Sequence, residues 1–103
     1  MVIVQSKNDV AIRLTRERWT HIVERHPEMD GQRHRVLETV SDPEMIQEGD
    51  FAEYLAIRFY NETPLTSKFL VVVYKEVDRT DGFILTAYYS GKPSERRRVL
   101  WKQ

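Results

Sequence analysis

Three consecutive segments rich in β-branched and aromatic residues fill the second half of the chain, and they constrain the fold more than any other feature. They read AEYLAIRFY, KFLVVVYKEV and GFILTAYYS, and the short polar connections NETPLTS and DRTDG separate them. Asp81–Gly82 is a turn signal ahead of the third segment. Strands with connections of hairpin length predict an antiparallel meander.

The first half is predicted to be mostly helical, after one or two short strands within the alternating residues 2–14. Thr15 is a suitable N-cap for a first helix, and Pro27 ends it. Its apolar positions recur at i, i+3, i+4 and i+7, namely Trp19, Ile22, Val23 and His26. A second helix is expected from about residue 31, and SDPE predicts a further short helical turn anchored by Met45 and Ile46.

This order of elements, strand–(strand)–helix–helix–strand–strand–strand, predicts one α+β domain over residues 1–103. Two N-terminal helices would pack on one face of an antiparallel sheet of about four strands. The chain has no cysteine, which excludes disulfides and thiolate metal ligands. It has no apolar run of membrane-span length and no secretory signal pattern, so a cytoplasmic protein without a membrane partner is expected.

Side chains alternate between the two faces of a strand, so the sequence also predicts which of them leave the core. The face expected to stay open carries Arg58 and Tyr60 from the first segment, and Ile84, Thr86, Tyr88 and Ser90 from the third. The central strand adds either Lys75, or Tyr74 with Glu76. Arginine offers a fixed fork for phosphate and tyrosine a ring for base stacking, so this face is a candidate nucleic-acid surface. Ordinary exposed residues of a half-solvated sheet are the alternative interpretation.

All three histidines, His21, His26 and His34, lie in one early segment. His21 and His26 are five residues apart, so their side chains diverge by about 140° around a helix. Zinc-binding helices instead use an i, i+4 spacing, so neither a metal site nor a cofactor is expected. His21 is expected at the surface. His26 lies on the apolar stripe, either as a core-edge histidine bonded to a carbonyl or as a group that exchanges protons near neutral pH.

The C-terminal stretch GKPSERRRVLWKQ holds five basic side chains and one acid, in a chain whose net charge is zero. Lys92, Arg96, Arg97 and Arg98 follow the last predicted strand and are candidates to rim the same open face, as a polyanion-binding surface would require. A solvated charged tail is the alternative. Overall neutrality argues against a protein that coats nucleic acid nonspecifically.

Several of these segments together carry a resemblance that spans residues 13–102. They are RLTRERWTHIVERHPEM, VLETVSDPEMIQEGD, LAIRFY, FLVVVYKE, GFILTAYYS and RRRVLWK. The chain resembles small bacterial and archaeal proteins related to the phage-associated branch of the barnase–EndoU–colicin–RelE nucleases. The resemblance implies a RelE-like fold, with two helices on a four-stranded antiparallel sheet. It also implies a metal-independent ribonuclease of toxin–antitoxin or phage-conflict type.

The resemblance further implies a catalytic set with His26 or His21 as the acid or base, together with Arg58, Thr86 and Tyr88 from the strands. The expected nucleic-acid-binding residues are Tyr60, Lys75, Lys92, Arg96, Arg97 and Arg98. RNA is the expected partner, along with a cognate antitoxin or immunity protein. A non-catalytic RNA- or protein-binding module of the same fold is the alternative, as is a homodimer formed through the apolar central strand or Trp101.

Overall fold

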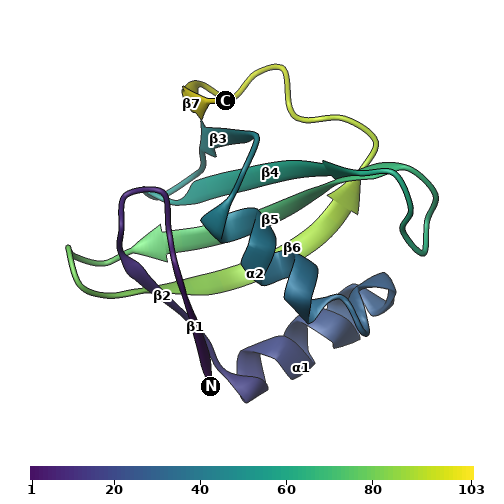
Figure 1. The fold of residues 1–103 in the computed structure, drawn as a ribbon, viewed down its shortest axis with the longest axis horizontal. Helices are drawn as coiled ribbons and strands as arrows, with labels where there is room; N and C mark the ends of the chain where they lie inside the picture. Colours follow the sequence, from purple (N-terminus) through teal and green to yellow (C-terminus); the bar gives the residue numbers. More distant parts are fainter.

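A computed structural model describes all residues, 1–103, and it has the predicted α+β class (Figure 1). Its elements are β1 (Val2–Gln5), β2 (Ala11–Leu14), α1 (Arg16–Arg25), the 3-10 turn η1 (Pro27–Met29), α2 (Arg33–Ser41), β3 (Met45–Glu48), β4 (Tyr54–Tyr60), β5 (Lys68–Glu76), β6 (Gly82–Ser90) and β7 (Val99–Lys102). The strands form one sheet in the order β1-β2-β6-β5-β4-β3-β7. Only β2 and β6 pair in parallel. None of the helices is long and apolar enough to cross a membrane.

The sheet has seven strands instead of about four, because residues 2–14 form two strands and two segments expected to lie outside the sheet are strands as well. Met45 and Ile46 were expected in a helical turn, but they begin β3, which pairs with β4. An extended chain lets Met45 contact the outer cluster of the sheet while Ile46 is buried. The C-terminal residues, for which no strand was predicted, include β7, whose Trp101 pairs with Ile46. Strands β3 and β7 lie next to each other at one end of the strand order, and both are short, so the sequence of each one alone gives little indication of a strand.

The predicted boundaries of the first helix are confirmed, and they matter for the site described below. The Thr15 side chain accepts a hydrogen bond from the Arg18 amide and so caps the N-terminus of α1. At the other end, His26 is the C-cap, and Pro27 starts η1. Proline disfavours helical backbone in the residue before it, so His26 turns out of the helix.

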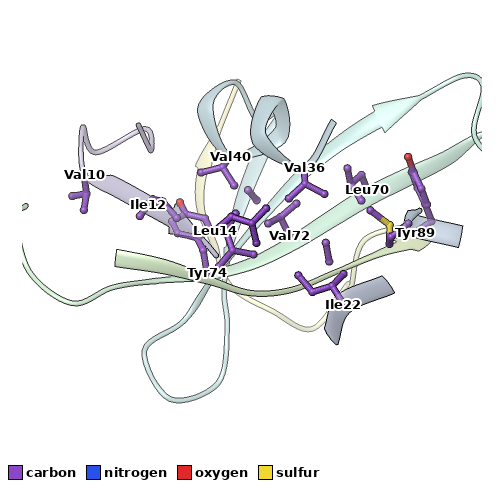
Figure 2. Packing of buried hydrophobic residues seen from close by; sticks show 14 residues of the cluster. Val10, Ile12, Leu14, Ile22, Val36, Val40, Leu70, Val72, Tyr74 and Tyr89 are labelled. Carbon is purple, nitrogen blue, oxygen red and sulfur yellow. The ribbon is translucent and has the colours of Figure 1, made fainter. Parts of the chain in front are cut away.

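The main hydrophobic core lies between the helices and one face of the sheet, which we call the helix face (Figure 2). Ile22 of α1 and Val36 and Val40 of α2 pack against Leu70 and Val72 of β5. The opposite face, which we call the outer face, has a smaller cluster of its own. It consists of Leu55, Ile57, Val71 and Val73. Both faces of the central strands are therefore apolar, which explains their nearly continuous hydrophobic sequence.

The predicted facing of β4 is wrong. Ala56 belongs to the core on the helix face, and alternation places Arg58 and Tyr60 on that face as well. The alternating residues of the same strand, Leu55 and Ile57, point to the outer face. The small Ala56 leaves room for α2, and the outer cluster provides burial for the larger aliphatic residues. The apolar half of the strand was therefore assigned to the wrong side.

The predicted facing of β6 is partly right, because a β-bulge interrupts its alternation. Val73 pairs with Thr86 whereas Tyr74 pairs with Ile84, so Leu85 is an extra residue without a partner on β5. Thr86 and Tyr88 lie on the outer face as predicted. Ile84 was expected on the outer face but lies in the core on the helix face. One inserted residue reverses the face to which the preceding residues of the strand point.

Gly82 occupies a position at the start of β6 that has no room for a side chain. A Cβ there would lie 2.7 Å from Cδ1 of Ile12 and even closer to the carbonyl oxygen of Lys75. We expect Gly82→Ala to lower the free energy of unfolding by about 1–3 kcal/mol, as overpacking does elsewhere, measured by urea denaturation. Gly91→Ala is the control, because its added Cβ would lie 3.9 Å from its nearest neighbour. Equal losses for the two variants would contradict this explanation.

Candidate functional site: a groove between α1 and β6

Helix α1 lies alongside the edge of β6 that faces away from β5, where most of the strand has no partner strand (Figure 1). Strand β2 pairs only with the beginning of β6, through Ile12 with Gly82 and Arg13 with Phe83. Ile22 of α1 points into the core. Arg18, His21 and Arg25 have a spacing of i, i+3 and i+7, which places them within about 60° of one another around the helix. One stripe of α1 therefore presents three basic side chains beside β6.

A groove of about 420 Å³ runs between this stripe and the strand. Its lining residues are Arg18, His21, Arg25, His26, Leu85, Thr86 and Tyr88. Four of the five predicted catalytic residues, His21, His26, Thr86 and Tyr88, are thus brought together. The fifth, Arg58, is absent from the groove.

The β-bulge contributes to the shape of this groove. It turns Leu85 and Thr86 toward the outer face in succession, so both line the groove. Nη1 of Arg18 lies 3.5 Å from the carbonyl oxygen of Leu85, the unpaired residue of the bulge. This contact ties the basic stripe of α1 to the strand at the point where its regular pairing is broken. Bulges often lie next to functional sites because they redirect side chains in this way.

His26 reaches the outer face instead of being sealed under the helices. Its ring centroid is 5.8 Å from that of Tyr88, with 34° between the ring planes. Its Nδ1 lies 3.9 Å from a carboxylate oxygen of Glu28, and its side chain is 33% exposed. The non-helical backbone of His26, imposed by Pro27, directs the ring over β6. Both of its contacts leave part of the imidazole accessible to a ligand in the groove.

The groove is basic and contains no acidic lining residue. None of the ion pairs in the protein involves Arg18, His21 or Arg25. Glu28 approaches His26, but it does not line the groove. Two guanidinium groups without carboxylate partners therefore line the same groove as two imidazoles. Such a site favours an anionic ligand.

Arg58 and Tyr60 instead connect β4 to α2 on the helix face, so their predicted place beside Thr86 is wrong. Nη1 of Arg58 donates to the carbonyl and the carboxylate of Asp42, at 2.8 and 3.0 Å. The Tyr60 hydroxyl donates to Glu38 at 2.6 Å. Burial opposes the charge of Arg58, but the neighbouring Glu38 and Asp42 outweigh it and raise the pKa of the guanidinium. The fold already uses both side chains.

Most of the predicted basic rim is neutralised by acids. Arg97 pairs with Asp50 at 3.3 Å and Arg98 with Glu48 at 3.0 Å. Lys92 contacts Glu95 at 3.4 Å. Arg96 is exposed and joins no ion pair. Alternation from Val71 and Val73 places Lys75, and not Tyr74, on the outer face, which settles the alternative left open by the sequence.

Sequence reasoning missed Arg18 and Arg25, the two cations of the groove. Their spacing with His21 was present in the sequence as a polar stripe next to the apolar one. A polar stripe on a helix normally faces solvent, however, and nothing local indicates that β6 lies beside it. His34 is exposed and lines a different hollow, with Trp19. Nowhere in the protein do three or more His, Asp or Glu side chains form a cluster suited to a metal ion.

Alkaline titration should detect the connection between β4 and α2. Burial raises the pKa of Tyr60 above the ordinary value of 10.0, and its hydrogen bond to Glu38 adds to the rise. Burial likewise raises the pKa of Tyr74. A raised folded-state pKa stabilises the fold fully below pH 10, and this contribution is lost as the pH rises further. We therefore expect the urea midpoint to fall above pH 10.

Tyrosine absorbance at high pH provides the measurement. Part of the signal should appear later than that of free tyrosine, and Tyr60→Phe should remove a share of this late fraction. A titration curve of Tyr60→Phe identical in shape to that of the native protein would contradict the burial and hydrogen bonding described for Tyr60.

Comparison with known proteins gives no match to a family model, to a curated protein or to a solved structure. The resemblance to phage-associated nucleases therefore remains a prediction, and the groove itself has to carry the functional interpretation.

Proposed function

We propose that this protein is a metal-independent ribonuclease whose active site is the groove between α1 and β6. The observation that carries the proposal is the meeting of two histidines and two unpaired arginines in one groove, next to a threonine and a tyrosine. These are the groups needed to hold a phosphodiester and to move protons around it.

RNA needs no external nucleophile, because each ribose carries a 2′-hydroxyl next to the phosphate. A base removes the proton of this hydroxyl while the 2′-oxygen bonds to phosphorus. The bond from phosphorus to the 5′-oxygen then breaks, and an acid returns a proton to that oxygen. The products are a 2′,3′-cyclic phosphate and a 5′-hydroxyl, and no oxidant or metal ion takes part.

The groove residues fit these roles by chemistry and position. His26 and His21 are the two proton carriers, because imidazole exchanges protons near neutral pH. Arg18 and Arg25 neutralise the additional negative charge that develops on the phosphorane, which is usually the largest contribution to such catalysis. Thr86 donates a hydrogen bond to a nonbridging oxygen. The ring of Tyr88, already beside His26, stacks on a base.

The same proposal includes the finer fold assignment, a RelE-like member of the barnase–EndoU–colicin–RelE nucleases with additional strands, and a cognate antitoxin or immunity protein as partner. The support for it is the resemblance in sequence together with the helices preceding the meander. The alternative is an RNA-binding module with the same groove and no turnover. The near-zero net charge favours this alternative over a nonspecific coat protein.

Incubation of the purified protein with end-labelled single-stranded RNA, with and without EDTA, tests the proposal. We expect cleavage in both samples, with 2′,3′-cyclic phosphate ends identified by mass spectrometry, and salt-sensitive binding. Binding without cleavage would favour the binding module. Cleavage that EDTA abolishes, or products with other ends, would contradict the mechanism.

A further inference from the structure

The turn between β3 and β4 holds a large apolar side chain in solvent on unfavourable backbone. Phe51 and Ala52 have φ values of 52° and 63°, and the Glu53 amide donates to the Asp50 carbonyl at 3.1 Å to close the turn. Residues with a Cβ disfavour this left-handed region, and Asn-Gly is the usual pair at such positions. Yet Phe51 is 88% exposed and contributes nothing to either core.

This turn adjoins the arginines that precede β7. Gly49 and Asp50 line a hollow of about 540 Å³ together with Glu48, Ser94, Arg96, Arg97 and Arg98. Two ion pairs cross the hollow, from Arg97 to Asp50 and from Arg98 to Glu48. Arg97 therefore fixes the base of the turn that presents Phe51. Three guanidinium groups face two carboxylates, so the hollow keeps one excess positive charge, and Arg96 is free to contact an anion.

The pairing register connects this hollow to the groove. Residues paired across the outer face form one row from β6 to β7, in the order Thr86, Val73, Leu55, Gln47 and Val99. Thr86 lines the groove, and Val99 directly follows Arg98. The row crosses four strand spacings, about 19 Å at the usual distance between strands. A few nucleotides of single-stranded RNA span that distance.

We propose that Phe51 is a second RNA contact: its ring stacks on an unpaired base of a strand whose reacting phosphate occupies the α1/β6 groove, and Arg96 contacts the backbone between them. This inference rests on the proposed function and adds to it the substrate class, single-stranded RNA long enough to cross the outer face. Exposed aromatic rings beside arginines bind single strands in this way with little sequence preference. The hydrogen-bonded turn already presents the ring to solvent before RNA arrives.

The matched variants are Phe51→Gly and Phe51→Trp. Glycine tolerates the left-handed backbone and removes the ring, so the thermal midpoint should stay equal to the native value or rise. Binding of a long 2′-O-methyl RNA, which cannot be cleaved, should weaken roughly five- to hundred-fold, the usual range for one stacked base. Phe51→Trp should retain native affinity. Cleavage of a dinucleotide, which fills only the groove, should be unchanged in both variants.

Each contrary result has a distinct meaning. Native affinity of Phe51→Gly for the long strand would overturn the inference, because the ring would then make no contact with the RNA. Equal losses on long RNA and on the dinucleotide would overturn it as well, because the turn would then act through the groove. Native protein that neither binds nor cleaves RNA would reject the proposed function itself, whereas an active enzyme indifferent to Phe51 would reject only this second contact.

Discussion

His26→Ala is expected to slow RNA cleavage about 10²–10⁴-fold, the usual contribution of one positioned acid or base. His26 is the ring that leaves α1 at Pro27 and lies over Tyr88, so its removal leaves the groove with one imidazole. The side chain is one-third exposed and its loss opens no core cavity, so the thermal midpoint should change little. Single-turnover cleavage of labelled RNA measures the rate.

His34→Ala is the control for this variant, since His34 is exposed and lies in a different hollow. The pH–rate profile separates the two groove histidines. An enzyme with both should show a bell-shaped profile, and His21→Ala and His26→Ala should each lose a different limb. Full activity of His26→Ala, or equal losses in His26→Ala and His34→Ala, would refute a proton-transfer role for His26.

Arg25→Ala is expected to slow cleavage about 10²–10³-fold, which is the cost of removing one group that stabilises a developing oxyanion. The affinity for RNA should also become less sensitive to salt, because one fewer phosphate contact releases counterions. Arg25 tests this better than Arg18, because Arg18 also contacts the backbone of the bulge. Cleavage rate and the salt dependence of binding are measured on the same RNA.

Arg58→Ala is the matched arginine control. Arg58 lies on the helix face and pairs with Asp42 and Glu38, so its loss should leave cleavage unchanged. The free energy of unfolding should fall by about 1 kcal/mol or less, because the pair is partly exposed. The opposite pattern, with Arg58 needed for cleavage and Arg25 dispensable, would contradict the assignment of the active site to the groove between α1 and β6.

The parts of the fold that local chemistry determines were predictable from the sequence. Thr15 and Pro27 delimit α1 because a cap and a proline act within one or two residues of a helix end. The meander strands were evident from their composition. Strands β3 and β7 were not, since four residues after Pro43 or after an arginine run become strands only by pairing with each other and with β4.

Facing was the weaker part of the prediction, and the candidate site shows why. Alternation divides β4 into two sets, but it does not tell which set meets the helices when the outer face has a hydrophobic cluster of its own. The bulge at Leu85 leaves no signature in the sequence, and it moves Ile84 to the core. The position of Thr86 and Tyr88 could be predicted, whereas their proximity to Arg25 depends on where α1 docks.

That docking has a consequence beyond catalysis. Along most of its length, β6 has a helix beside it where another strand would otherwise pair, so α1 covers a strand edge whose backbone groups have no partner strand. Uncovered strand edges pair with other chains and start aggregation. An anion that bridges the arginines of α1 and the hydroxyl of Thr86 would hold α1 against β6, so the ligand that the groove binds should also protect the protein from aggregation during storage or heating.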